Sequence, residues 1–195
     1  MSKIIIVLFL IIVSIVHLSA YSTQTMDHMD AFPVYGDGPV EVHIYTNYFC
    51  TSCRTLELQI EPYLMDLVEQ NLIQLKFIDL PIDQESRLCF HYFLYASKAE
   101  NSLEKAFKVR KMLFDKAFSG EIVTEDSLIE LFQKNDVTYE FFDVRIFYSH
   151  FKELLKGDNI SFVPTVVIIK EGRKEFYFQP DTIINALWTI TALTK

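Results

Sequence analysis

The chain is poor in cysteine, with only three among its 195 residues. A small domain held together by disulfides needs more cysteines, and an even number of them, so this class of protein is excluded. The chain also lacks an excess of positive charge, and its net charge of -8 argues against binding to nucleic acid. Half of the residues are apolar, which is enough to build one globular domain with a substantial core.

The chain has no apolar run long enough to span a bilayer comfortably. The longest run, from Ile4 to Val16, has about 13 residues and follows Lys3, which suits the hydrophobic region of a signal peptide. Ala20-Tyr21-Ser22 then offers the small-x-small pattern for cleavage before Thr23. We therefore expect residues 1–22 to be a signal peptide and the protein to work outside the cytoplasm, in the periplasm or secreted. The alternative is an uncleaved N-terminal anchor formed by the same apolar run (residues 4–16).

The pattern of apolar residues after this segment predicts a mixed α/β fold. Residues 23–39 are polar and rich in turn formers, and we interpret them as a tether. The expected elements are a strand (40–45), a helix (51–70), a strand (72–80), a block of helices (84–156), two paired strands (160–170 and 174–178) and a final helix (180–193). We expect Trp188, in the last helix, to belong to the core.

Two of the three cysteines form a Cys-x-x-Cys motif, Cys50-Thr51-Ser52-Cys53, where the first strand gives way to the first helix. The first sulfur lies at the helix N-terminus, where free N–H groups and the positive end of the dipole favour a thiolate. The thiolate is the form that attacks disulfides. The second sulfur, one turn further on, can reach back and close a bond with the first. This spacing predicts a redox-active dithiol.

Three segments give the chain a resemblance to a known family. They are Phe49 to Cys53 after the first strand, Ile60 to Leu64 in the first helix, and Phe162-Val163-Pro164-Thr165 at the start of a late strand. Together, over roughly residues 38–193, they resemble the DsbA-like branch of the thioredoxin superfamily. The resemblance implies a thioredoxin-like α/β fold with an inserted helical subdomain.

The resemblance also implies a division of the chain and a set of site residues. The thioredoxin-like domain would comprise residues 40–83 and 157–195, with residues 84–156 as the helical insertion. The implied site consists of the catalytic pair Cys50 and Cys53, the dipeptide Thr51 and Ser52 between them, and the substrate-binding residues Val163, Pro164 and Thr165. A cis peptide bond before Pro164 would turn the backbone of Val163 toward the sulfurs, where it can pair with a substrate backbone.

The chain departs from the family pattern at two places. The family often carries a buried acid six residues before the first cysteine, where this chain has Ile44. We expect Glu41 and His43 to point to the other face of the strand, so proton transfer must use water or another group. The dipeptide Thr51-Ser52 also lacks the histidine of strongly oxidising members. Its hydroxyls can donate hydrogen bonds to a thiolate but bring no charge, which implies a milder oxidant.

Other uses of the cysteine pair have less support in the sequence. A zinc site usually needs four ligands, and the only further pair on offer, Cys89 and His91, lies on different faces of a helix. Cys89 itself falls in an apolar stripe, so we expect a buried, inert thiol. We expect no metal and no other cofactor, because the dithiol itself carries the electrons.

The sequence therefore predicts an exported thiol–disulfide oxidoreductase in which Cys50 forms a mixed disulfide with a protein substrate and Cys53 resolves it. Its expected partners are protein thiols or disulfides and a membrane-bound redox protein that recycles the pair. Oxidase, reductase and isomerase remain open at this point. The alternatives are a thioredoxin-fold binding or adaptor module without redox turnover, and a metal-binding Cys-x-x-Cys protein.

Overall fold

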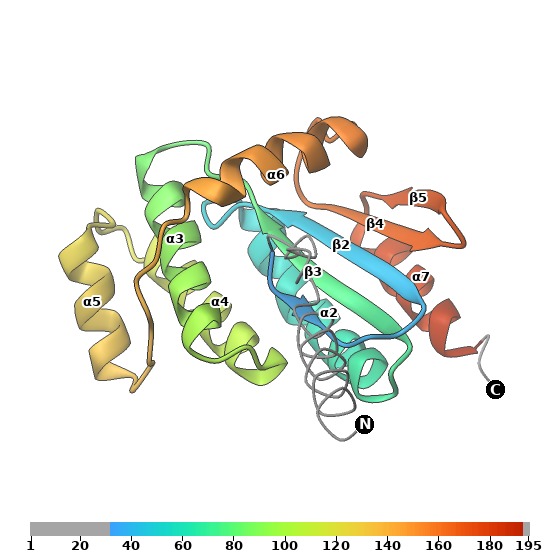
Figure 1. Ribbon diagram of the computed structural model, residues 1–195, viewed down its shortest axis with the longest axis horizontal. Helices are drawn as coiled ribbons and strands as arrows, with labels where there is room; N and C mark the ends of the chain where they lie inside the picture. The colour runs from blue at the N-terminus through green and yellow to red at the C-terminus, as the bar shows by residue number, and fades with distance from the viewer. Residues whose placement is uncertain (1–31, 193–195) are drawn as a thin grey trace, which may run out of the picture.

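The computed structural model describes residues 32–192 of the chain. The elements, labelled as in Figure 1, are β1 (Val34–Tyr35), β2 (Val40–Thr46), α2 (Thr51–Glu69), β3 (Ile73–Asp79), α3 (Gln84–Ala99), α4 (Leu103–Ala117), α5 (Glu125–Lys134), α6 (Arg145–Gly157), β4 (Thr165–Lys170), β5 (Arg173–Tyr177) and α7 (Pro180–Ala192). The expected signal peptide or anchor (1–22) lies outside the described residues, as does the first part of the expected tether. Between residues 32 and 192, no helix combines the length and the apolar character that crossing a membrane requires.

The five strands form one sheet in the order β1-β3-β2-β4-β5. β2 and β3 run parallel, and α2 supplies the long crossover that a parallel pair needs. β4 is antiparallel to β2, with Thr165 opposite Tyr45, and β5 is antiparallel to β4. The start of β4 therefore lies beside the end of β2, directly before the cysteine motif.

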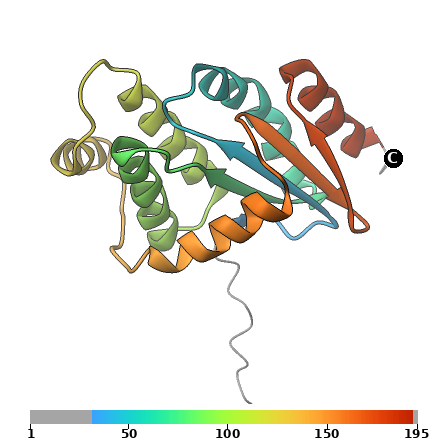
Figure 2. The same cartoon turned by 90° about the horizontal axis from the view of Figure 1, so that it is seen from above.

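Helices cover both faces of this sheet, as Figure 2 shows from above. α2 and α7 pack side by side on one face, and α6 crosses the other. Successive side chains of a strand point to opposite faces, so Ile44 and Tyr45 of β2 lie on different faces of the sheet. Both are fully buried, because helices cover both faces. The near-continuous apolar sequence of β2 follows from this burial on both sides.

Between β3 and β4 the described chain contains only helices, and this confirms the expected helical insertion. Capping boxes start two of them: the Asp83 side chain accepts the Ser86 N–H at the start of α3, and Thr124 does the same with Ser127 for α5. Thr124 is therefore the N-cap of α5. The helices α3, α4 and α5 stand at one side of the sheet (Figure 1).

Two expectations about strands differ from the structure. Within the expected tether, Val34 and Tyr35 form β1, which pairs antiparallel with β3. Tyr35 is buried there, so this segment belongs to the folded domain. The strand expected from residue 160 begins only at Thr165, because the preceding Pro164 has no N–H to donate to a sheet.

The expectation for Trp188 is wrong, because its side chain is 61% exposed. α7 instead buries Ile183, Leu187 and Ile190, which are spaced by four and three residues and so share one face of the helix. Trp188 follows Leu187 directly, and each residue of a helix is rotated by about 100° from the one before it, so the Trp188 side chain points away from the buried face. Its aromatic character suggested the core, but its position on α7 places it outside.

Candidate active site

The turn between β2 and α2 is held in place by Asn47. Its side-chain oxygen accepts the Phe49 N–H at 2.8 Å, and its amide donates to the Leu80 carbonyl at 2.6 Å. The Cys50 N–H donates to the Asn47 carbonyl at 3.0 Å. Cys50 is the N-cap of α2, with an extended backbone at φ -98° and ψ 113°. The cysteine motif therefore sits on a turn that is tied to the end of the neighbouring strand.

The sulfur of Cys50 takes the place of a capping side chain. It accepts the Cys53 N–H at a Sγ···N distance of 3.2 Å, which satisfies one of the donors left free at a helix start. The Ser52 hydroxyl lies 3.2 Å from the same sulfur. Thr51 and Ser52 are both exposed. The N–H and the hydroxyl are thus placed to donate hydrogen bonds to a thiolate.

The two cysteines of the motif differ in exposure, and both carry free thiols in this structure. Cys50 is half-buried, whereas Cys53 has no accessible surface. Burial raises the pKa of the Cys53 thiol well above its ordinary value, and the neighbouring Cys50 and the charge of Asp79 add to the rise. Cys53 therefore remains protonated at neutral pH, and Cys50 is the sulfur that an incoming molecule can reach.

The segment around Pro164 lies beside Cys50, although the two are far apart in the sequence. The Val163–Pro164 peptide bond is cis, as the family resemblance implied. The Cys50 sulfur lies 4.0 Å from the Val163 carbonyl oxygen across a separation of 113 residues. Thr165 is buried, and its hydroxyl donates to the Phe162 carbonyl at 2.8 Å. The structure thus brings Val163 to the sulfur, and the buried Thr165 stabilises the segment through its hydrogen bond to Phe162.

Ile44 is fully buried at the position where the family often has an acid. The ionisable neighbours of Ile44 along β2 make their contacts on the opposite face of the strand. His43 Nδ1 lies 3.4 Å from the Asp158 carboxylate, and its Nε2 lies 3.4 Å from Glu41. Tyr45 donates to the same Asp158 carboxylate at 2.5 Å. These contacts tie the end of α6 to the sheet.

A buried charged cluster of Glu57, Asp79 and Arg110 was missed by the sequence analysis. Arg110 Nη1 donates to both oxygens of Asp79, at 2.9 and 2.7 Å. Its Nε and Nη2 donate to the two oxygens of Glu57, the latter at 2.9 Å. Arg110 is completely buried, and neither acid is more than 4% exposed. The cluster joins α2, the end of β3 and α4.

The sequence does contain a signal for this cluster. Glu57 shares the buried face of α2 with Cys53, and a charged residue on such a face calls for a partner. Asp79 ends an otherwise apolar strand, and Arg110 directly follows the buried Val109. The pattern marks these positions as unusual, but it does not say which charges meet.

Cys89 lies in the core with no accessible surface, as expected. Burial raises the pKa of its thiol to about 12, and the charges of nearby acids add to the effect. His91 instead faces Tyr148, with Nε2 2.7 Å from the hydroxyl oxygen. Within residues 32–192, no group of three or more His, Cys, Asp or Glu side chains is gathered as metal ligands would be.

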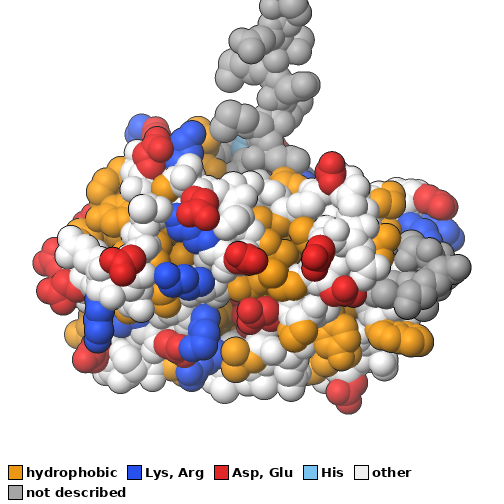
Figure 3. Space-filling model, turned by 90° about the horizontal axis from the view of Figure 1, so that it is seen from below, with side chains coloured by type: hydrophobic (Ala, Val, Ile, Leu, Met, Phe, Trp, Pro, Cys, Tyr) orange, Lys and Arg blue, Asp and Glu red, His pale blue; other side chains and the backbone are white. Residues whose placement is uncertain are grey.

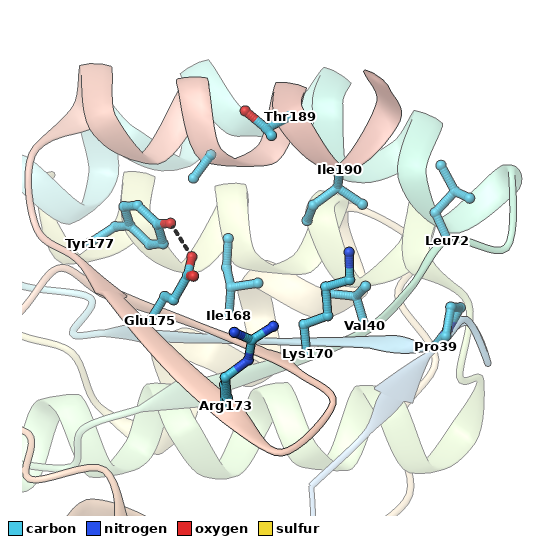
Figure 4. A pocket seen from close by; sticks show the side chains of 11 residues that line it. Pro39, Val40, Leu72, Ile168, Lys170, Arg173, Glu175, Tyr177, Thr189 and Ile190 are labelled. Carbon is cyan, nitrogen blue, oxygen red and sulfur yellow. Dashed lines mark hydrogen bonds between the residues drawn. The ribbon is translucent and has the colours of Figure 1, made fainter. Parts of the chain in front are cut away.

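An apolar pocket of about 440 Å³ opens at the other end of the sheet (Figure 4). It lies between α7 and the β4–β5 hairpin, from which Lys170 and Arg173 reach toward it. Val40, at the start of β2, contributes to its lining, whereas Cys50 follows the end of that strand. A strand of this length spans about 20 Å, so the pocket is remote from the cysteine pair.

Charged side chains of both signs share the surface on the side of the helical insertion. Seen from below, Lys and Arg side chains gather there with Asp and Glu among them (Figure 3). On α4, Lys111 pairs with Asp115, and Lys116 pairs with Glu121. This part of the surface therefore presents no extended patch of positive charge.

A family model described as Thioredoxin matches residues 33–176, which is most of the chain. The match includes the cysteine motif and the Val163–Pro164 segment on either side of the helical insertion. A search of curated protein sequences finds no match to this chain.

Three solved structures illustrate what the fold resembles. Oxidised BdbD from Bacillus subtilis has a TM-score of 0.63 and 20% identity, over 83% of this chain and 94% of BdbD. A periplasmic thioredoxin-like protein from Salmonella enterica serovar Typhimurium has a TM-score of 0.63 and 18% identity, over 85% and 93%. A variant of alpha-DsbA1 from Wolbachia pipientis has a TM-score of 0.63 and 14% identity, over 83% and 91%. The chain belongs to the thioredoxin family, and its fold is that of the DsbA-like thiol–disulfide oxidoreductases.

Proposed function

We propose that this protein is an exported thiol–disulfide oxidoreductase that exchanges disulfides with other proteins through Cys50 and Cys53. One observation carries the proposal: an accessible sulfur at a helix N-terminus has a buried partner sulfur one turn further on. An accessible sulfur can attack or be attacked, and a buried one beside it can only react within the protein. Membership of the thioredoxin family supports the same reaction class.

The exchange takes place in two steps. When a substrate disulfide is reduced, the Cys50 thiolate attacks one substrate sulfur, and the other leaves as a thiolate and takes up a proton. Cys53 then loses its proton and attacks the sulfur of Cys50. The bond between Cys50 and the substrate breaks, and the second substrate sulfur leaves with the electron pair. Two electrons pass from the dithiol to the substrate, and the reverse sequence oxidises a substrate dithiol.

The substrate would bind beside Val163 and Pro164. The Val163 carbonyl lies 4.0 Å from the Cys50 sulfur, so a substrate chain bonded to that sulfur passes this backbone. Pro164 has no N–H of its own to compete for the substrate. The rings of Phe162 and Phe178 are in contact, 4.8 Å apart between centroids and tilted by 47°, and both side chains are exposed. They offer an apolar surface to the same chain. Thr165 supports this binding edge through its bond to Phe162.

The partners and location that we propose follow from the same chemistry. Each turnover leaves the pair in the opposite redox state, so a second protein, proposed to be membrane-bound, must restore it. Disulfide chemistry on proteins belongs to compartments outside the cytoplasm. We propose no cofactor. The mass of the mature protein tests the export signal, because cleavage before Thr23 predicts a chain that begins at that residue.

An exchange assay with matched cysteine variants tests the function. The purified protein is assayed for insulin reduction and for oxidation of a dithiol peptide. We expect Cys50→Ser to abolish both activities and Cys53→Ser to accumulate a mixed disulfide, visible on a non-reducing gel. Cys89→Ser serves as the control for loss of a thiol and should retain activity. Full activity of Cys50→Ser would refute the proposal, and substrate binding without any turnover would favour the adaptor alternative.

A further inference from the structure

The buried cluster has used all the hydrogen-bonding capacity of its single cation. The Arg110 guanidinium has five N–H donors. Two go to Asp79 and two to Glu57, and the last goes to the Thr46 hydroxyl at 3.0 Å. The Phe77 ring covers the guanidinium, with its centroid 4.1 Å from Cζ. No donor is left to bind a further carboxylate or water.

The cluster nevertheless holds more negative than positive charge. Two carboxylates face one guanidinium, and the other groups bound to Asp79 are the neutral hydroxyls of Thr46 and Tyr48. Burial raises the pKa of Glu57, Arg110 opposes the rise, and Asp79 adds to it. A surplus charge inside a protein acts strongly on other ionisable groups, because little solvent screens it.

The surplus charge lies next to the buried half of the cysteine motif. Glu57 follows Cys53 by four residues on the buried face of α2, and side chains with this spacing have Cβ atoms about 5–6 Å apart. Burial is the main cause of the raised pKa of Cys53, and the charge of Asp79 adds to it. The titratable and charged groups on the elements packed around this site are Cys50 and Glu57 of α2, Tyr48 of the preceding turn, Asp79 of β3, Cys89 of α3 and Arg110 of α4.

We propose that the surplus negative charge of the Asp79–Arg110–Glu57 cluster holds the proton on Cys53 and thereby sets the rate at which Cys53 attacks a mixed disulfide on Cys50. The consequence for catalysis rests on the proposed function. Within residues 32–192, no hydrogen bond joins the cluster to either sulfur. Its members are therefore positioning residues that act on Cys53 through their electrostatic field.

The charge matters at one step of the exchange. Before attack, Cys53 must give its proton to solvent, and the resulting thiolate bonds to the sulfur of Cys50. A nearby negative charge opposes the formation of that thiolate. Removing one carboxylate should therefore make the attack faster at a given pH, and the mixed disulfide should have a shorter lifetime.

Titration of Cys53 by NMR tests the electrostatic part directly. In a Cys50→Ser, Cys89→Ala background, Cys53 is the only thiol, and the NMR shift of its labelled Cβ carbon follows its ionisation without a reagent that must reach the buried sulfur. We expect Glu57→Gln and Asp79→Asn each to lower the midpoint by about one pH unit. Glu57→Asp keeps the charge and should keep the parent midpoint. Glu61→Gln, the same change one turn further along α2, is the matched control and should leave the midpoint unchanged.

The outcomes separate this inference from the proposed function. Unchanged profiles for folded Glu57→Gln and Asp79→Asn would overturn the inference, whatever the protein does in exchange assays. If neither variant folds, the Cys50→Ser, Cys89→Ala parent provides the test. A Cys53 midpoint at the usual thiol value of about 8.5 in that parent would also overturn the inference. Shifted midpoints with no exchange activity would support the electrostatics and reject the proposed function. In the active protein, Glu57→Gln should resolve a mixed disulfide about tenfold faster than the parent.

Discussion

Removing the cation of the buried cluster should destabilise the protein severely. Arg110→Met keeps a long side chain among Phe77 and its neighbours but deletes the guanidinium. Asp79 and Glu57 would then remain buried, at 1% and 4% exposure, with no cation and without most of their donors. The methionine retains much of the packing, so the loss reports mainly the unpaired charges.

The expected loss in the free energy of unfolding is about 3–5 kcal/mol, the usual cost of breaking a buried ion pair. A domain of this kind has about 5–15 kcal/mol in total, so about a fifth or more of the stability is at stake. Urea unfolding at pH 7, followed by circular dichroism, measures the difference. Arg54→Met is the matched control, because Arg54 pairs with Asp115 at 2.6 Å on the surface and should cost about 1 kcal/mol or less.

The loss should also depend on pH in a defined direction. The pKa of Glu57 is raised in the folded protein above the ordinary value of 4.5, chiefly by burial. A carboxyl group with a raised pKa binds its proton more readily when folded, so stability falls as pH rises above about 4.5. In Arg110→Met, stability should fall more steeply as the pH rises. The loss in the free energy of unfolding relative to the parent protein should therefore be smaller at pH 4 than at pH 7. A loss below about 1 kcal/mol, or one that is equal at pH 4 and pH 7, would refute the reasoning.

Three further predictions concern other parts of the molecule. In the native reduced protein, iodoacetamide should modify Cys50 before Cys53, because only Cys50 is accessible, and equal rates in a peptide map would contradict this. Asp158→Asn should destabilise most at pH 7 and progressively less as the pH falls below 3.8. Burial opposes ionisation, but bonds from His43 and other donors hold the pKa of this carboxyl below its usual 3.8, so its contribution is lost only as the pH falls from 3.8 through the lowered pKa. Equal losses at pH 7 and pH 3 in urea unfolding would argue against that pairing. Trp188→Ala should change the free energy of unfolding by about 0.5 kcal/mol or less, and a loss above 2 kcal/mol would show that the exposed ring is packed.

The local sequence determined the order of elements and the position of the cysteine pair. Alternating apolar residues before Asn47 and a helical period after Cys50 predict a strand and a helix, and the structure has both. The strand and the helix are predictable because each depends on residues close together in the sequence. The resemblance to the DsbA-like branch, and not the local pattern, implied a cis bond before Pro164, and that bond is present.

The charged cluster and the direction of Trp188 required the fold itself. Arg110 meets Glu57 across 53 residues and Asp79 across 31, and many ionisable residues in the chain could have been such partners. A buried ionisable side chain needs a counter-charge, but only the packing of α4 against α2 and β3 selects which one is within reach. Likewise, an aromatic residue on an amphipathic helix is buried or exposed by rotation about the helix axis, and the sheet beneath α7 buries Leu187 and leaves Trp188 in solvent.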